Sequence, residues 1–402
     1  MRLVAPRFAL PARAILATCL LSLPTSPRAA DDFTGYLFAY FTGNDKAQEA
    51  IRFALSDDGY NYKAINKGNP VVSSATISAT GGVRDPHILR GPAGAYRMVA
   101  TDMVSANGWN SNYGMVLLKS TNLVDWTSAK VNMRTAFPSF AAADRVWAPQ
   151  TIWDSTANKY MVYFAMRLGG SDIDKIYWAY ANDDFTALAT TPKVLYTYDG
   201  KPAIDGDIVL LAGTYHLFFK TEGNGNGIKS ATSKNLTGPY TLIDKYVQPT
   251  TKAVEGSCAF KLTNSDTWIL MYDMYMDGMY QFATSTNLLD FQVASKSYTF
   301  DFTPRHGTVI PVTASEKYAL NAKWNPSSVA PSASRPGLVQ AGRQLLARGE
   351  MRVVLVDLAG KTWLDRRVEG TESVLDLSGM PSGVYAARTF GADSWAGAVL
   401  VP

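Results

Sequence analysis

The chain has 402 residues, of which 47% are hydrophobic, 12% aromatic and only 18% charged, a composition that excludes an intrinsically disordered protein and a coiled coil. Its formal net charge of +4 arises in the first thirty residues, which contain four arginines and no acidic residue. The remainder carries 34 basic and 34 acidic residues, so its composition gives no sign of a nucleic-acid partner. The length fits about two or three domains, or one large all-β domain with an appendage.

Residues 1–30 have the layout of a secretory signal peptide. Arginines precede an apolar run over residues 14–23, and small residues end the segment at Ala29 and Ala30. The run is too short to span a bilayer, which takes about 20 apolar residues, and no later stretch is long and apolar enough. We therefore predict export to the medium or the cell surface, without a membrane span. Cleavage would leave Cys258 as the only cysteine, so no internal disulfide is expected.

Five similar units of about 50 to 65 residues follow one another, a period typical of propeller blades. Each unit contains a strand rich in aromatic and β-branched residues, at residues 36–41, 96–101, 160–165, 215–220 and 268–273. Each also contains a polar turn that closes on an aromatic residue, at residues 56–60, 120–126, 181–185, 233–240 and 285–291. Because one small sheet cannot bury both of its faces alone, five stacked copies predict an all-β fold, a five-bladed β-propeller.

A shorter strand accompanies each aromatic strand, at residues 85–89, 149–153, 205–209, 255–259 and 306–310. We expect these short strands to be innermost, where they line the central funnel. The last of them follows the fifth unit in the sequence. We predict that it returns beside residues 36–41 to complete the first blade, which removes two sheet edges.

The first residues of the short strands bring titratable groups toward one axis. The same position of each unit holds, in chain order, Asp85, Pro149 or Gln150, Asp205, Glu255 and His306. Gathering carboxylates costs stability, but it suits glycoside hydrolysis, which uses one carboxylic acid and one carboxylate. Each acidic residue taken alone is more typical of a turn or a strand end, but their common register in successive repeats favours the catalytic interpretation, with Asp207 as a rival to Asp205.

Five short motifs, taken in order, resemble glycoside hydrolase family 43: Arg84-Asp85-Pro86, Trp147-Ala148-Pro149, Ala203-Ile204-Asp205, Val254-Glu255-Gly256 and Arg305-His306-Gly307. The resemblance implies that Asp85 is the general base, Glu255 the general acid and Asp205 the residue that tunes and orients the acid. It further implies inversion of the anomeric configuration, for which the two carboxyl groups stand about 6.5 to 9.5 Å apart. Gln150 departs from the family pattern, in which many members carry an acidic residue at this place.

Three further residues are candidates for substrate binding. Trp147 is the preferred sugar contact because it immediately precedes a funnel strand, and Arg305 and His306 lie together at the start of another. The resemblance also implies that a structural calcium or sodium ion can lie on the propeller axis near His306, with no cofactor required. A hydrogen-bonded core histidine is an equal interpretation of His306.

The composition changes at Trp324, where a segment rich in Pro, Ser and Ala begins. A compact β pattern follows it and resembles the small C-terminal sorting modules of exported bacterial enzymes, with a packing or sugar-binding role as the alternative. We predict four parts: a signal peptide over residues 1–30, the propeller over 31–323, a linker over 324–340 and a small β-sandwich-like module over 341–402.

These features predict a secreted, inverting glycoside hydrolase that removes sugar residues from plant-type polysaccharides, with α-L-arabinofuranosidase as the first candidate. The family resemblance leaves β-xylosidase, galactofuranosidase and endo-arabinanase activities open. A propeller that binds carbohydrate without catalysis is an alternative of another class, which the trio of Asp85, Asp205 and Glu255 disfavours. We expect a neutral oligo- or polysaccharide substrate and a monomeric protein.

Overall fold

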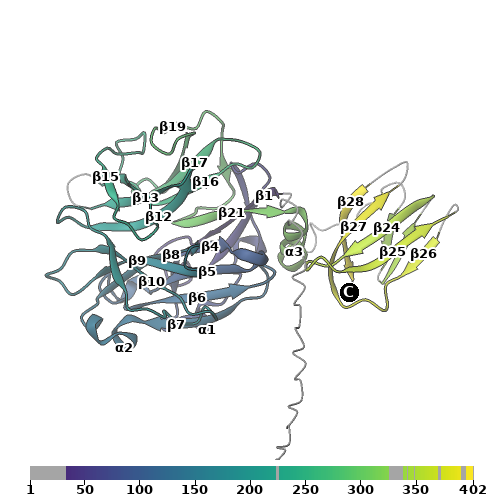
Figure 1. The fold of residues 1–402 in the computed structure, drawn as a ribbon, viewed down its shortest axis with the longest axis horizontal. Coiled ribbons are helices and arrows are strands. Elements are labelled where there is room, and N and C mark those ends of the chain that lie inside the picture. Colours follow the sequence, from purple (N-terminus) through teal and green to yellow (C-terminus); the bar gives the residue numbers. More distant parts are fainter. Residues whose placement is uncertain are drawn as a thin grey trace, which may run out of the picture. The chain divides into compact units, whose positions relative to one another are not determined.

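A computed structural model describes residues 33–222, 226–325, 338–341, 343–347, 349–369, 373–390 and 395–401. The predicted signal peptide and most of the predicted linker lie outside these residues. Within them, strands dominate and helices are short, as the sequence predicts (Figure 1).

Five sheets follow one another along the chain and form the blades of a propeller, which confirms the predicted fold. The first blade contains β1 (Phe33–Tyr40), β2 (Arg52–Ser56), β3 (Asn61–Ala64), β20 (Thr299–Phe300) and β21 (Gly307–Thr313). The second contains β4 (Val83–Arg90), β5 (Tyr96–Asp102), β6 (Gly114–Ser120) and β7 (Thr127–Asn132). The third contains β8 (Arg145–Asp154), β9 (Lys159–Arg167), β10 (Lys175–Tyr180) and β11 (Lys193–Tyr196).

The last two blades repeat this four-stranded arrangement. The fourth contains β12 (Ala203–Leu211), β13 (Thr214–Thr221), β14 (Ile228–Ser233) and β15 (Thr241–Ile243). The fifth contains β16 (Glu255–Lys261), β17 (Trp268–Met274), β18 (Met279–Ser285) and β19 (Gln292–Val293). Contacts link β4 to β8, β8 to β12, β12 to β16, β16 to β21 and β21 to β4, so the innermost strands form a closed ring.

The ring closes through the pairing that the sequence predicts. Strand β21 pairs antiparallel with β1, and Tyr36 lies opposite Pro311 while Tyr40 lies opposite Gly307. Strand β21 thereby completes the first blade, so the first and last strands of the propeller pair with each other.

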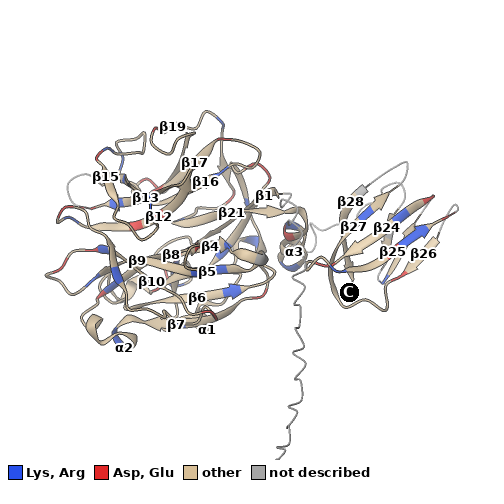
Figure 2. Cartoon of the chain, in the orientation of Figure 1, with Lys and Arg blue, Asp and Glu red and all other residues tan. Residues whose placement is uncertain are grey.

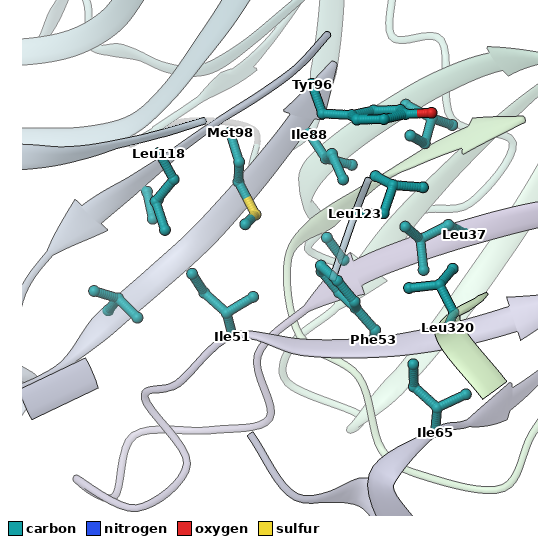
Figure 3. Close-up of a cluster of buried hydrophobic side chains, with 14 of the residues drawn as sticks. Leu37, Ile51, Phe53, Ile65, Ile88, Tyr96, Met98, Leu118, Leu123 and Leu320 are labelled. Carbon is teal, nitrogen blue, oxygen red and sulfur yellow. The ribbon is translucent and has the colours of Figure 1, made fainter. Parts of the chain in front are cut away.

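Apolar side chains fill the space between each pair of neighbouring blades. In the cluster shown in Figure 3, Leu37 of the first blade packs with Met98 and Leu118 of the second. The other blade pairs have equivalent clusters, and one of them stacks the fifth blade on the first through Phe38 and Phe282. The aromatic strands identified in the sequence therefore supply the packing between blades.

Short helices occupy the connections: η1 (Asn66–Gly68), α1 (Ser74–Ile77), η2 (Pro92–Gly94), η3 (Ser105–Asn107), α2 (Met133–Ala136), η4 (Pro138–Phe140) and α3 (Ala314–Trp324). The sequence analysis did not predict α3. The Thr313 side chain caps its first turn, and Glu316 accepts a hydrogen bond from the Thr313 backbone N–H in return. Glu316 also forms an ion pair with Arg90 of β4 at 2.6 Å, which ties α3 to the second blade.

The described residues after 337 form two sheets of their own. One contains β22 (Leu338–Ala341), β23 (Gln344–Ala347) and β26 (Ser373–Asp376), and the other β24 (Met351–Val356), β25 (Thr362–Val368), β27 (Gly383–Phe390) and β28 (Trp395–Val401). Leu345 of the first sheet shares a buried cluster with Leu355 and Tyr385 of the second. Two sheets with one shared core make the predicted sandwich-like module.

Basic and acidic residues are interspersed along the described strands and loops, in keeping with the balanced charge of the sequence (Figure 2). None of the helices among the described residues is long and apolar enough to cross a membrane.

Candidate active site

Four of the innermost strands are interrupted by a bulge at the same level of the propeller. The ladder to the second strand skips between Arg84 and His87, Trp147 and Gln150, Ile204 and Asp207, and Glu255 and Cys258. Within each bulge one residue has a positive φ: Asp85 (51°), Ala148 (42°), Asp205 (52°) and Gly256 (63°). A bulge re-aims side chains out of the regular alternation, so the funnel residues owe their direction to this repeated irregularity.

The bulges correct the alignment drawn from the sequence. Asp85 and Asp205 do share one position, but Glu255 lies one residue earlier in its bulge, and the third blade contributes Ala148 there instead of Pro149 or Gln150. The physical reason is steric. A Cβ at the left-handed position of the fifth blade would lie 2.6 Å from His306 Cγ, so only glycine fits at residue 256.

A pocket of about 530 Å³ opens at this level, and all the predicted catalytic and substrate-binding residues line it. Its lining consists of Asn44, Arg84, Asp85, Met103, Trp109, Arg145, Trp147, Ile204, Asp205, Lys220, Glu222, Glu255, Tyr275, Met276, Arg305 and His306. Asp207, the rival to Asp205, is not in this lining. It is buried and accepts a hydrogen bond from the Ala259 backbone N–H at 2.7 Å.

Asp85 is held as a carboxylate. Its Oδ2 accepts a hydrogen bond from Thr101 Oγ1 at 2.7 Å, and its Oδ1 lies 3.5 Å from His306 Nδ1. The Thr101 hydroxyl accepts from the Ala148 backbone N–H, which leaves its proton for Asp85. Burial alone would raise the pKa of Asp85, but the hydrogen bond and charge of His306, together with Arg84, outweigh burial and hold it below its ordinary value.

Asp205 and His306 both have raised pKa values, whereas the pKa of Asp85 is lowered. Burial and the negative charges of Glu255 and Asp85 raise the pKa of Asp205 to about 6, against the opposing charge of His306. Burial would lower the pKa of His306, but the charges of Asp205, Asp85 and Glu255 outweigh it and raise that pKa to about 9. The imidazole is therefore a cation at neutral pH, surrounded by carboxyl groups. Asp205 Oδ2 also accepts a hydrogen bond from the Gly256 backbone N–H at 3.1 Å, next to Glu255.

Glu255 lies between two cations. Its Oε1 accepts a hydrogen bond from Arg305 Nη2 at 2.7 Å, and its Oε2 accepts one from Lys220 Nζ at 3.1 Å. Arg305 is anchored in turn by an ion pair with the buried Asp273. The sequence analysis singled out Arg305 but missed Lys220 and Asp273.

A signal for the missed residues was present in the repeat. Lys220 and Asp273 end the aromatic strands of the fourth and fifth units, and Thr101 ends that of the second. In the ladders these three lie directly opposite Ile204, Glu255 and Arg84, the first residues of the bulges. Lys220 lines the pocket, Thr101 donates to Asp85 and Asp273 pairs with Arg305, so an alignment of the second strands would have marked these polar residues.

Two tryptophans form one wall of the pocket. The rings of Trp109 and Trp147 meet edge to face with centroids 6.2 Å apart, and the Arg145 guanidinium lies 4.4 Å from the Trp147 ring. No described residue accepts a hydrogen bond from the buried Trp147 Nε1. Trp109 is 48% exposed, an unusual degree for such a large apolar side chain.

A family model described as a probable glycosyl hydrolase domain, of the type related to glycoside hydrolase family 43, matches residues 31–318. The chain belongs to this family. The resemblance drawn from the five motifs is thereby confirmed, and the pocket is the candidate active site of a glycoside hydrolase domain.

Other proteins are similar to this family 43-related chain. An α-L-arabinofuranosidase of Bifidobacterium longum subsp. longum is 26% identical over 270 residues, which cover 60% of this chain and 24% of that protein. The chain thus spans about a quarter of the length of that curated relative. A GH43 protein of Bacillus licheniformis gives a TM-score of 0.46 at 13% identity, covering 91% of this chain and 89% of that one. An exo-1,5-α-L-arabinanase from a bovine ruminal metagenomic library gives a TM-score of 0.46 at 14% identity, covering 67% of this chain and 95% of that one.

The family resemblance implies an axial ion near His306, whose Nδ1 faces Asp85 Oδ1 at 3.5 Å. Among the described residues, no three or more His, Cys, Asp or Glu side chains are grouped so as to hold a metal ion. An axial calcium or sodium ion held through water stays a prediction.

The contact between Gly256 and His306 leads to a stability prediction. Gly256→Ala is expected to destabilise the fold by about 1–2 kcal/mol for the left-handed backbone and by about 1–3 kcal/mol more for overpacking against the imidazole. Gly213 is the matched control, because its φ of 73° is similar but nothing lies within 4 Å of an added Cβ. Urea unfolding of both variants checks this, and equal losses of stability would show that the His306 contact is unimportant.

Proposed function

We propose that this protein is an inverting glycoside hydrolase in which Asp85 is the general base, Glu255 the general acid and Asp205 the residue that tunes and orients the acid. The observation that carries the proposal is the set of three carboxyl groups in one pocket, each in a different electrostatic setting. A lowered pKa keeps Asp85 ionised and ready to accept a proton at neutral pH.

The reaction needs one water molecule and two proton transfers. Asp85 takes a proton from the water as its oxygen bonds to the anomeric carbon. The glycosidic bond breaks at the same time, and Glu255 gives its proton to the departing oxygen. The products are a free sugar of inverted configuration and an alcohol or shortened chain. Asp205 places a further negative charge beside Glu255 and so opposes the two cations that favour its ionised form.

The lining of the pocket supports a neutral sugar as the substrate. Each lining arginine or lysine already has a carboxylate partner, as shown by Arg84 with Glu49 at 3.0 Å and Arg145 with Asp174 at 2.9 Å. The exposed ring of Trp109 is suited to contact with an apolar sugar face.

Within this class we propose release of α-L-arabinofuranosyl residues from plant-type polysaccharides, supported by the arabinofuranosidase relative. β-Xylosidase, galactofuranosidase and endo-arabinanase activities are the alternatives. Export by the N-terminal segment, sorting by the C-terminal module and a monomeric state belong to the same proposal.

A substrate panel tests the proposal. The protein is expected to hydrolyse 4-nitrophenyl α-L-arabinofuranoside faster than the β-D-xyloside or β-D-galactofuranoside, and proton NMR of the first product is expected to show the inverted anomer. A retained anomer would contradict the assignment of Asp85 as a base. Sugar binding without turnover of any glycoside would identify a non-catalytic carbohydrate-binding propeller.

A further inference from the structure

Lys220 is a buried lysine in the wall of the candidate active site, close to the end of β13. Only 4% of its surface is exposed. Its Nζ lies 3.1 Å from Glu255 Oε2, 3.2 Å from Glu222 Oε1 and 4.8 Å from the centre of the Tyr275 ring. A buried ammonium costs several kcal/mol unless it is paired, so this site is built to keep one charge in place.

Lys220 remains charged throughout the working range of pH. Burial would lower its pKa, but the negative charges of Glu255, Asp205 and Glu222 outweigh burial and raise that pKa above its ordinary value. A group that holds its proton so firmly is no proton donor in the reaction. Its influence on catalysis is therefore exerted through the carboxylates that it touches.

The two oxygens of Glu255 are held by different partners. Arg305 donates a hydrogen bond to Oε1 and is itself held by an ion pair with Asp273, while Lys220 donates one to Oε2. Two contacts on opposite oxygens fix the plane of a carboxyl group. They also favour its ionised form, whereas a general acid must carry a proton when substrate is bound.

We propose that Lys220 is a positioning residue for the general acid and that Glu222 is its alternative partner. The inference rests on the proposed function of Glu255. When Glu255 carries its proton, the attraction between Lys220 and Oε2 weakens, and Glu222 keeps the ammonium paired at the same place. When the proton has gone to the leaving group, Lys220 stabilises the resulting carboxylate. One fixed ammonium thus serves both protonation states of the acid.

The fourth blade contains a matched control for a buried lysine. Lys229 of β14 is also buried, forms an ion pair with Asp244 and lies 4.9 Å from the Tyr246 ring. It does not belong to the pocket lining. Lys229→Met therefore reports the loss of thermal stability caused by removing a buried lysine that does not contact the proposed acid.

The experiment compares Lys220→Met, Lys220→Arg and Lys229→Met with the wild type. We measure pH profiles of kcat/KM on the best glycoside of the panel, with a 2,4-dinitrophenyl and a phenyl leaving group, and thermal unfolding of each variant. Removing a positive charge next to the acid lets it keep its proton to higher pH, so Lys220→Met is expected to move the alkaline limb up by about one pH unit. Loss of alignment is expected to lower kcat at least about tenfold more for the phenyl than for the dinitrophenyl glycoside.

The control and the conservative variant complete the expected pattern. Lys220→Arg keeps the charge and is expected to keep the alkaline limb in place, and Lys229→Met is expected to change only thermal stability. If Lys220→Met does not fold, Glu222→Gln is measured in its place. Loss of the Glu222 charge leaves Lys220 paired with Glu255 alone, which is expected to favour the ionised acid and move the alkaline limb down.

The outcomes separate the two proposals. An unchanged alkaline limb and an unchanged ratio of the two leaving groups in the Lys220 and Glu222 variants would overturn the positioning role while Glu255→Gln still confirms the acid. An inactive wild type, or a Glu255→Gln variant with wild-type profiles, would overturn the proposed function and this inference with it.

Discussion

Glu255→Gln is expected to lower kcat/KM for a phenyl glycoside by about 10²–10⁴-fold, the usual contribution of a positioned general acid. The amide keeps the shape of the side chain and the acceptor oxygen that faces Arg305, but it has no acidic proton to give to the leaving oxygen. Substrate binding is expected to change little, so the loss should lie in kcat rather than in KM.

The leaving group distinguishes a lost acid from general damage to the site. A 2,4-dinitrophenyl group departs without protonation, so Glu255→Gln is expected to hydrolyse this glycoside at a rate close to that of the wild type. Glu369→Gln is the control, since it is the same substitution at an exposed carboxylate outside the pocket lining. An equal loss with both leaving groups would remove Glu255 from the role of acid.

The architecture could be predicted because the repeat has a direct physical cause. Each blade needs one strand whose aromatic side chains pack on the next blade, and Phe38, Phe164 and Phe219 lie in such strands and in three different clusters between blades. The closing role of residues 306–310 followed from the position of this fifth short strand after the fifth unit in the sequence. These features depend on composition and order, which one sequence shows fully.

The exact place of each pocket residue within its bulge could not be predicted in the same way. A bulge inserts one residue through a local backbone conformation, and nothing in the spacing of Asp85, Asp205 and Glu255 reveals which of them takes the positive φ. Gly256 carries the decisive information, since glycine after Glu255 is what the contact with His306 requires. Lys220 was missed because it lies on the second strand of its blade and meets Glu255 only across blades.

Asp85→Asn is expected to reduce kcat/KM by about 10²–10⁴-fold with every leaving group, because the step proposed for Asp85 is the activation of water and not the departure of the aglycone. His306 and Arg84 keep the pKa of Asp85 low, so the proposed base is ionised throughout the neutral range and the loss is expected to be uniform there. Asp207→Asn is the matched control. That buried carboxyl accepts a hydrogen bond from Ala259 outside the pocket lining, and the amide oxygen can accept it equally well.

A smaller side chain allows a chemical test of the same assignment. In Asp85→Ala an added azide ion can enter the space of the base and the water, bond to the anomeric carbon and displace the leaving group, which takes the proton of Glu255. The expected product is a glycosyl azide of inverted configuration, and its formation, followed by proton NMR, would restore activity as azide is added. An azide of retained configuration would place the nucleophile on the other face of the sugar and contradict the role of Asp85. Rescue of Asp85→Ala alongside wild-type activity in Asp207→Asn would locate the base at the bulge of β4.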